Sequence, residues 1–384
     1  MRILFVSGTS IGGAARSTHA LADVLTERGH VAATLMRKEN APGRSYVHRR
    51  LVNLRVKLRG HSAANLVDRV ARRIGTHLYI DDAHSRRTSW LAVRPENALR
   101  HALAAISPDV LVVNSIDLMA WRQLRADAAA RDLPVVLYIR EETGLLHLSH
   151  SRVPPDAIIA NAEGHAEGAR ELGYHAVVAP SVIEADECRV DSTRERVVLV
   201  NPVETHGVDV ALALAAARPD IPFTFVESWP LDAPVRQALL EVLRGLPNVV
   251  LRDATPDVRN VFRDARILLA PYRYPGRARV IAEAHINGLP ALASNSYGIV
   301  EAVGPGGVVL DPDGPIEDWI SAMSRLWDDD NYYDEMSRAA LECSARAEMQ
   351  PEHIASVVEQ VLSTVVSSSE ASSRRDPVPP RALP

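Results

Sequence analysis

Short, continuous runs of apolar residues alternate along this chain with segments of helical periodicity. Residues 3–6 form the first run, a loop with three glycines occupies 8–13, and residues 17–28 carry apolar side chains on one helical face. Residues 31–36 form the next apolar run. Strands buried on both faces of a parallel sheet are apolar without alternation, and a helix joins two such strands in a right-handed crossover. The chain therefore begins as a strand–loop–helix–strand unit of a parallel α/β sheet.

This alternation occurs in two successive series, which predicts two domains. The first series continues with strands expected at 110–113, 135–139 and 157–160, and the second begins with a strand at 196–200. A chain of 384 residues fits two domains of ordinary size, and 47% hydrophobic residues allow each its own core. We predict an α/β protein of two doubly wound, Rossmann-like domains that face each other across a cleft, where open α/β sheets bind ligands.

The predicted boundaries divide the chain into four parts. An N-terminal domain covers residues 1–184, and a C-terminal domain covers 185–350. Residues 351–366 form a helix that packs back on the N-terminal domain, and the Ser-, Arg- and Pro-rich tail at 367–384 is expected to be disordered. The stretch 38–94 is rich in Arg and His, and it is either a solvated surface or a mobile segment that faces a ligand.

Charge and cysteine content exclude several classes of function. The net charge of -5 argues against a nucleic-acid partner, since such proteins carry a basic excess. Cys188 and Cys343 have no metal-ligand spacing, so a disulfide framework is excluded and a reducing cytoplasm is the expected compartment. No apolar run approaches the roughly 18 residues of a transmembrane segment. His147 and His150 lack an acidic or cysteine partner at a repeated spacing, so we predict no metal site.

The first glycine loop is a candidate phosphate-binding element. Gly12 and Gly13 precede the first helix, where small residues let the backbone approach a phosphate and the helix offers free N–H groups. The spacing differs from the G-x-G-x-x-G of dinucleotide sites, and the second strand ends at Met36 without an acidic residue for a ribose. An NAD-dependent enzyme is therefore disfavoured, and a tight turn that requires glycine is the alternative interpretation of the loop.

The most informative segment is residues 279–294 (RVIAEAHINGLPALAS), with Glu283 in a predicted helix. This segment resembles the donor-binding signature of the family 4 retaining glycosyltransferases, which have the GT-B fold. Residues 298–304, the glycine-led helix at 12–30 and residues 201–209 are similar to further segments of that family. The resemblance extends over nearly the whole chain up to the tail.

The resemblance implies a nucleotide sugar of the GDP or UDP type in the C-terminal domain and a sugar acceptor in the N-terminal domain. It implies no cofactor and no metal, so helix N-termini, backbone N–H groups and basic side chains would meet the charge of the leaving diphosphate. It assigns Glu283 to the two ribose hydroxyls, and a solvated helix position is the alternative for this residue. Further donor contacts are expected from Gly12, Gly13, Gly298 and Glu301. The loop that contains Thr255 is expected to contact the nucleobase.

The chain departs from the family pattern at three donor-binding positions. Pro275 stands where the family usually has a second glutamate near the donor sugar. Asn201 and His206 stand where the family usually has an arginine and a lysine that reach the donor phosphates. We expect both to remain donor contacts, since His206 retains a hydrogen-bond donor and a partial positive charge.

Three arginines crowd the loop before Glu283. Arg279 matches a residue common in the family, whereas Arg273 and Arg277 are additional. We hypothesise that these arginines replace the lost phosphate contacts, because guanidinium groups bind phosphate well. Arg277 and Arg279 are expected to contact the donor. In the alternative, the arginines face solvent and the donor site is degenerate.

A further charged pair follows the strand expected at 135–139. Arg140 and Glu141 take the place of a His-Asp pair that many relatives carry near the reacting sugar. We predict that both are catalytic, with Arg140 stabilising the diphosphate or the substrate and Glu141 orienting the acceptor. In the alternative, the two side chains form an ion pair with each other at the cleft edge.

The sequence thus predicts a glycosyltransferase that moves a sugar from a nucleotide sugar to a soluble small-molecule acceptor, with retention of configuration. The altered donor contacts favour a modified sugar or an unusual acceptor, as in natural-product or antibiotic biosynthesis. The alternatives are a GT-B protein that binds a partner without transfer activity, and a GT-B nucleotide-sugar epimerase. A homodimer is compatible with the sequence.

Overall fold

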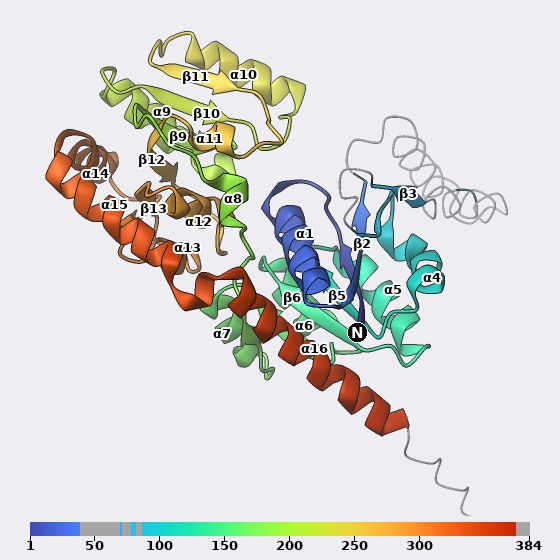
Figure 1. Ribbon diagram of the computed structural model, residues 1–384. Coiled ribbons are helices and arrows are strands. Elements are labelled where there is room, and N and C mark those ends of the chain that lie inside the picture. The colour runs from blue at the N-terminus through green and yellow to red at the C-terminus, as the bar shows by residue number, and fades with distance from the viewer. Residues whose placement is uncertain (39–69, 71–77, 82–86, 374–384) are drawn as a thin grey trace, which may run out of the picture.

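The computed structural model describes residues 1–38, 70, 78–81 and 87–373, which form two α/β units (Figure 1). Most of the Arg- and His-rich stretch at 38–94 lies outside the described residues, so its two interpretations stay open. Each unit is built on a largely parallel sheet whose strands are the apolar runs of the sequence. Two Rossmann-like units confirm the predicted fold class.

The N-terminal unit has its strands in the order β3-β4-β2-β1-β5-β6-β7-β8, and all neighbours are parallel except β3 and β4. The order reverses between β1 and β5, which opens a crevice at their carboxyl ends. The strands are β1 (Arg2–Ser7), β2 (Val31–Arg37), β3 (Leu78–Ile80), β4 (Ser89–Ala92), β5 (Val110–Asn114), β6 (Val135–Ile139), β7 (Ala157–Ala160) and β8 (Val177–Val178). The helices are α1 (Gly12–Glu27), α4 (Pro95–Ile106), α5 (Leu118–Ala129), α6 (Thr143–His150), α7 (Glu163–Glu171) and α8 (Ala185–Cys188).

The C-terminal unit has the strand order β11-β10-β9-β12-β13-β14, all parallel, and its order reverses between β9 and β12. The strands are β9 (Arg196–Val200), β10 (Phe223–Val226), β11 (Val249–Arg252), β12 (Ala265–Ala270), β13 (Ala291–Ser294) and β14 (Gly307–Leu310). The helices are α9 (Val208–Ala217), α10 (Ala233–Leu243), α11 (Arg259–Phe262), α12 (Arg279–Ile286), α13 (Ile299–Val303), α14 (Ile316–Asp328) and α15 (Asp330–Ala345), with short 3₁₀ turns at Glu204–His206 and Ala347–Met349.

Helices cover both faces of each sheet, which explains why the central strands are apolar without alternation. In the N-terminal unit, one apolar core joins the sheet to α4 and α5, and another joins it to α1 and the last helix, α16 (Pro351–Ser373). Strands β5 and β6 are buried at every position. The cores hold the carboxyl ends of the strands in place, and the loops that follow those ends carry the polar residues of the candidate site.

Helix α16 connects the two units at their side. It continues from the C-terminal unit and runs along the N-terminal unit, where Ile354, Val358 and Leu362 are buried against the sheet and α1 (Figure 1). The helix extends to Ser373, seven residues beyond the end that the sequence predicted at 366. The reason is that serine and alanine continue a helix, and the first residue that stops one is Pro377.

No helix in the described part of the chain is long and apolar enough to cross a membrane. Among the same residues, no group of three or more His, Cys, Asp or Glu side chains is arranged to hold a metal ion.

A candidate anion site between the two units

The candidate site lies where the carboxyl ends of both sheets meet. Helix α1 starts from the loop after β1, Arg140 follows β6, and α12 starts from the loop after β12. The segment 179–183, which leads from β8 into the C-terminal unit, passes between them. Side chains from both units therefore converge on one small volume.

The glycine loop brings the start of α1 against the C-terminal unit. A Cβ atom on Gly8 would lie 1.9 Å from the Ser115 carbonyl oxygen, so only glycine lets this loop pass the end of β5. Cβ atoms on Gly12 and Gly13 would lie 3.5 Å from the Trp229 ring and 3.5 Å from Cβ of Arg279. Helix α1 has no capping side chain and no acidic residue in its first turn. Its first N–H groups are therefore free to meet an anion between the units.

Glu283 forms the centre of the site, because arginines from both units contact its carboxylate. Its side chain is 0% exposed, and Oε1 accepts a hydrogen bond of 2.6 Å from Nε of Arg279, one turn earlier on α12. Nη2 of Arg16, from α1, lies 3.2 Å from Oε1 and 3.4 Å from Oε2 of the same carboxylate. The interpretation of Glu283 as a solvated helix residue is therefore wrong.

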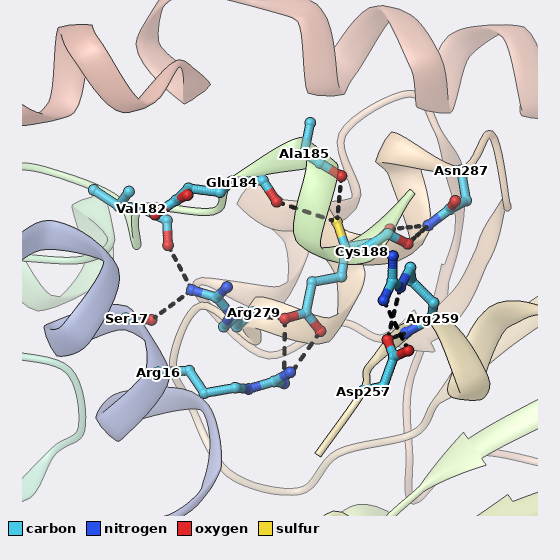
Figure 2. Close-up of polar contacts among 11 residues, drawn as sticks. Arg16, Ser17, Val182, Glu184, Ala185, Cys188, Asp257, Arg259, Arg279 and Asn287 are labelled. Atoms are coloured by element: carbon cyan, nitrogen blue, oxygen red, sulfur yellow. Dashed lines mark hydrogen bonds and ion pairs between the residues drawn. The ribbon is translucent and has the colours of Figure 1, made fainter. Parts of the chain in front are cut away.

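Arg279 is held by both units. Besides Glu283, its Nη1 donates a hydrogen bond of 3.3 Å to Oγ of Ser17 on α1. The same nitrogen donates to the backbone carbonyl of Val182 in the connecting segment (Figure 2). Arg279 is thus a fixed cation at the start of α12, as a phosphate-binding arginine would be.

Arg140 is a buried cation that forms no ion pair with any carboxylate among the described residues. It is 7% exposed, its Nη1 donates a 3.0 Å hydrogen bond to Oγ of Ser181, and its guanidinium lies 4.0 Å from the centroid of the Tyr138 ring. Its Nε has no hydrogen-bond partner. Burial lowers the pKa of Arg140, and the neighbouring positive charge of Arg279 lowers it further. An arginine that is buried and incompletely satisfied in this way calls for an anion.

Glu141, which the alternative interpretation paired with Arg140, lies elsewhere. Glu141 is exposed, and Oε1 accepts a 2.6 Å hydrogen bond from Oγ of Ser115, which follows β5. No ion pair among the described residues joins Arg140 to Glu141, so the alternative of a mutual pair is wrong. The two residues separate into a buried cation and a carboxylate at the rim.

Asn201 and His206, at the end of β9, serve the local fold. Asn201 has φ of 58°, a left-handed conformation that Asn tolerates, and Oδ1 accepts a 2.7 Å hydrogen bond from the backbone N–H of Ser228. Nδ1 of His206 lies 3.0 Å from the Val200 carbonyl, and its ring centroid is 4.4 Å from that of Tyr272. Burial lowers the pKa of His206, so the ring is neutral at pH 7. The partial positive charge expected of His206 is therefore absent.

Aromatic rings surround His206. Its ring centroid lies 5.3 Å from that of Tyr274 and 6.0 Å from that of Trp229, and Tyr272 stacks on Tyr274 at 5.4 Å. We call His206, Trp229, Tyr272 and Tyr274 the aromatic cluster. Since Trp229 faces Gly12, this cluster lines the C-terminal side of the same site.

Arg273 has other partners than those expected. Its Nη1 and Nη2 donate to the two carboxylate oxygens of Asp209 at 2.7 and 2.8 Å, and its Nε donates to Asp313 at 3.0 Å. Two carboxylates already neutralise this guanidinium, and they raise its pKa. Arg273 therefore holds the loop to α9 and does not offer a free charge to a phosphate.

Arg277 and Glu301 lie on the side of the site that joins the units. Nη1 of Arg277 is 3.6 Å from Oε2 of Glu301, and its Nη2 contacts Sδ of Met349 at 3.2 Å. Glu301 also accepts hydrogen bonds from the backbone N–H groups of Glu163 and Gly164, at 2.9 and 3.2 Å, where α7 begins. These contacts satisfy the carboxylate without a ligand.

Gly298 and Thr255 complete the set of predicted donor contacts. Gly298 has φ of 77°, and a Cβ atom there would lie 2.6 Å from the carbonyl carbon of Gly276, so glycine is needed for the close approach of two loops. Oγ1 of Thr255 accepts a 3.2 Å hydrogen bond from the backbone N–H of Asp257. This bond closes a local turn after β11, and a contact from Thr255 to a base stays a prediction.

Sequence reasoning missed Arg16, Ser17 and Ser181. Arg16 and Ser17 lie one helical turn beyond the glycine loop, and their position near an uncapped helix start was an available signal. Ser181 follows Pro180 in a connecting segment, and no local pattern marks it.

Comparisons with known proteins agree with this architecture. Residues 210–329 match the family model described as "Glycosyl transferases group 1". No curated protein matches the sequence significantly. Sucrose-phosphate synthase from Thermosynechococcus elongatus superimposes with a TM-score of 0.72 over 96% of this chain and 100% of that chain, at 14% identity.

Two further solved structures are similar. HepE from Anabaena, in complex with UDP, has a TM-score of 0.68 over 95% of this chain and 100% of that chain, at 13% identity. The catalytic domain of starch synthase IV from Arabidopsis thaliana, bound to ADP and acarbose, has a TM-score of 0.67 over 96% of this chain and 99% of that chain, at 10% identity. At these identities the comparisons show the fold, which is GT-B.

Proposed function

We propose that the protein is a glycosyltransferase that moves a sugar from a nucleoside-diphosphate sugar to a small-molecule acceptor. The family match within the C-terminal unit and the GT-B fold support this proposal. The similar HepE was solved with UDP and with UDP-glucose, which are ligands of the proposed class.

The charge balance of the site carries the proposal. Arg16, Arg140 and Arg279 provide three positive charges at the site. Among the described residues, Glu283 is the one buried carboxylate that pairs with them, which leaves two of the charges uncompensated. A nucleoside-diphosphate sugar carries about two negative charges on its diphosphate, and guanidinium groups bind phosphate oxygens strongly. The free N–H groups at the start of α1 add a partial positive charge.

The residues have distinct roles in this proposal. Glu283 accepts hydrogen bonds from the ribose hydroxyls, while Arg140 and Arg279 stabilise the charge that develops on the diphosphate as the bond from the sugar to the phosphate breaks. Ser115 and Glu141, at the rim of the N-terminal unit, orient the acceptor. No metal is needed, because side chains and helix N–H groups meet the leaving charge.

We further propose retention of configuration and a modified donor sugar. Retention arises when the acceptor hydroxyl attacks from the face that the diphosphate leaves and gives its proton to a diphosphate oxygen. Pro275 supplies no carboxylate for sugar hydroxyls, and the aromatic cluster offers ring faces in its place. Such a surface suits a sugar with fewer hydroxyls, as in specialised metabolism, and we place the reaction in the cytoplasm.

A GT-B protein that binds a partner without transfer activity is the second candidate. It is motivated by Asn201, His206 and Arg273, each of which makes hydrogen bonds within the protein. Transfer to an acceptor, or hydrolysis of the donor, by purified protein would exclude it.

Thermal unfolding with UDP, GDP, ADP, dTDP and NAD tests the proposal. A ligand at about 100 times its dissociation constant stabilises a protein by roughly 2.7 kcal/mol, which shifts the unfolding midpoint measurably. We expect a shift with at least one nucleoside diphosphate and none with NAD. The absence of a shift with every diphosphate at millimolar concentration would refute the transferase and favour the second candidate. A nucleotide sugar on the base that shifts the midpoint is then tested for turnover.

A further inference from the structure

Arg16 reaches across the site from one unit to the other. Its guanidinium is attached to α1 (Figure 2), yet the described residues offer it only one partner. That partner is the Glu283 carboxylate on α12. The Arg16 side chain is 40% exposed, and the two contacts measure 3.2 and 3.4 Å. Ion pairs of this geometry with one exposed member are weak and easily exchanged.

Arg279 differs from Arg16 in every one of these respects. It is buried, its Nε donates to Glu283 at 2.6 Å, and Ser17 and Val182 hold its other end. Because Arg279 is fixed at three points and Arg16 at one, a ligand that competes for Glu283 displaces Arg16 first.

The proposed function creates such a competition. The Glu283 carboxylate is 0% exposed, and both of its oxygens are engaged by arginines. Two ribose hydroxyls that donate to this carboxylate need the oxygen lone pairs that Arg16 now occupies. The ribose and Arg16 therefore bind Glu283 alternately.

We propose that Arg16 is an exchangeable phosphate ligand, which pairs with Glu283 in the unliganded protein and moves to the donor diphosphate when the ribose takes Glu283. The inference rests on the proposed function of this site. Arg16 belongs to the same helix start whose free N–H groups face the site, so a diphosphate held there lies within reach of its flexible side chain. It supplies a cation that Asn201 and the neutral His206 do not.

Exchange predicts opposite effects on two ligands that share a base. A nucleoside must displace Arg16 and gains nothing from it, so Arg16→Ala strengthens nucleoside binding by about two- to fivefold, the worth of an exposed ion pair. The nucleoside diphosphate loses a charge-assisted contact, so the same change weakens its binding by roughly tenfold to a hundredfold.

Calorimetric titration of the full chain measures both affinities. The probes are uridine and UDP, or the nucleoside and diphosphate of whichever base binds the wild type best. Arg2→Ala is the matched control, since Arg2 is an exposed arginine paired with Asp109 at the opposite end of the sheet, and it should leave both affinities unchanged. Arg16→Lys keeps the charge but loses the planar fork, so it should weaken diphosphate binding less than Arg16→Ala.

The outcomes separate the inference from the proposed function. A parallel loss for nucleoside and diphosphate would show that Arg16 merely shapes the pocket, and tighter binding of both would show a blocking residue that never reaches the phosphates; either result overturns the exchange. Wild-type protein that binds no diphosphate would overturn the proposed function itself. If Arg16→Ala does not fold, as judged by its midpoint without ligand, Arg16→Lys decides, since exchange requires it to weaken the diphosphate and spare the nucleoside.

Discussion

Replacement of Arg140 by methionine separates a ligand-binding role from a structural one. Arg140 is 7% exposed. Removing a buried arginine from an ion pair usually destabilises a protein by about 3–5 kcal/mol, because its carboxylate partner is left buried and unpaired. Within the described part of the chain, Arg140 has no carboxylate partner to leave behind, and its Nε has no hydrogen-bond partner. Methionine has a similar length and fits irregular apolar surroundings.

The expected effect on stability is a near cancellation. The variant loses the hydrogen bond to Ser181, worth about 1.5–3 kcal/mol for a charged donor, and the contact with the Tyr138 ring, worth about 0.5–2 kcal/mol. It gains about 1–3 kcal/mol because it no longer buries an unsatisfied nitrogen, and several kcal/mol because it no longer buries a charge. We expect the unfolding free energy to change by no more than about 1 kcal/mol, a midpoint shift of about 2–4 °C.

Thermal unfolding with and without the best nucleoside diphosphate is the assay. Arg140→Met should keep the midpoint of the unliganded protein and lose most of the ligand-induced shift. Arg125→Met is the matched control, because Arg125 is a buried arginine on α5 that donates to Asp156 and Pro154. It should lower stability by about 1–3 kcal/mol and leave ligand binding intact. A loss above roughly 3 kcal/mol in unliganded Arg140→Met, with a normal ligand shift, would refute the reasoning.

Three further predictions follow from the same geometry. Glu283→Gln keeps the size of the side chain and removes the negative charge that pairs with two arginines and would bind the ribose. Titration should show nucleoside binding weakened by about tenfold or more. Unchanged nucleoside affinity would exclude the ribose role. Glu301→Ala removes the contact to the start of α7, so stability should fall by about 1–2 kcal/mol in urea unfolding while diphosphate affinity stays within a few-fold; loss of that affinity would instead support Glu301 as a donor ligand. Burial lowers the pKa of His285 from 6.5 to about 4, so between these values the unfolded chain binds more protons and stability falls as pH falls; His285→Gln should remove up to about 3 kcal/mol of this loss at pH 4, and an identical pH profile would contradict it.

Local patterns of the sequence were enough for the fold. The apolar runs predicted strands because burial on both faces removes polar residues from a parallel strand, and the structure confirms this in β5 and β6. The glycine loop was recognised because close backbone approach requires small residues at adjacent positions, and the Glu283 segment was recognised through its resemblance to a known family. The helix end at 366 was wrong because a serine-rich stretch resembles a disordered tail in composition.

The roles of the arginines required the tertiary structure. Arg273, Arg277 and Arg279 lie within seven residues and carry the same charge, so local sequence could not rank them. Arg273 meets Asp209, 64 positions away, and Arg279 meets Val182, 97 positions away. The sequence by itself determined two facing α/β units and a glycine loop, because those features depend on near neighbours. Only the tertiary structure decided which arginines remain available to a ligand. The reason is that the carboxylates that neutralise a guanidinium come from distant segments of the chain, and only folding brings them to it.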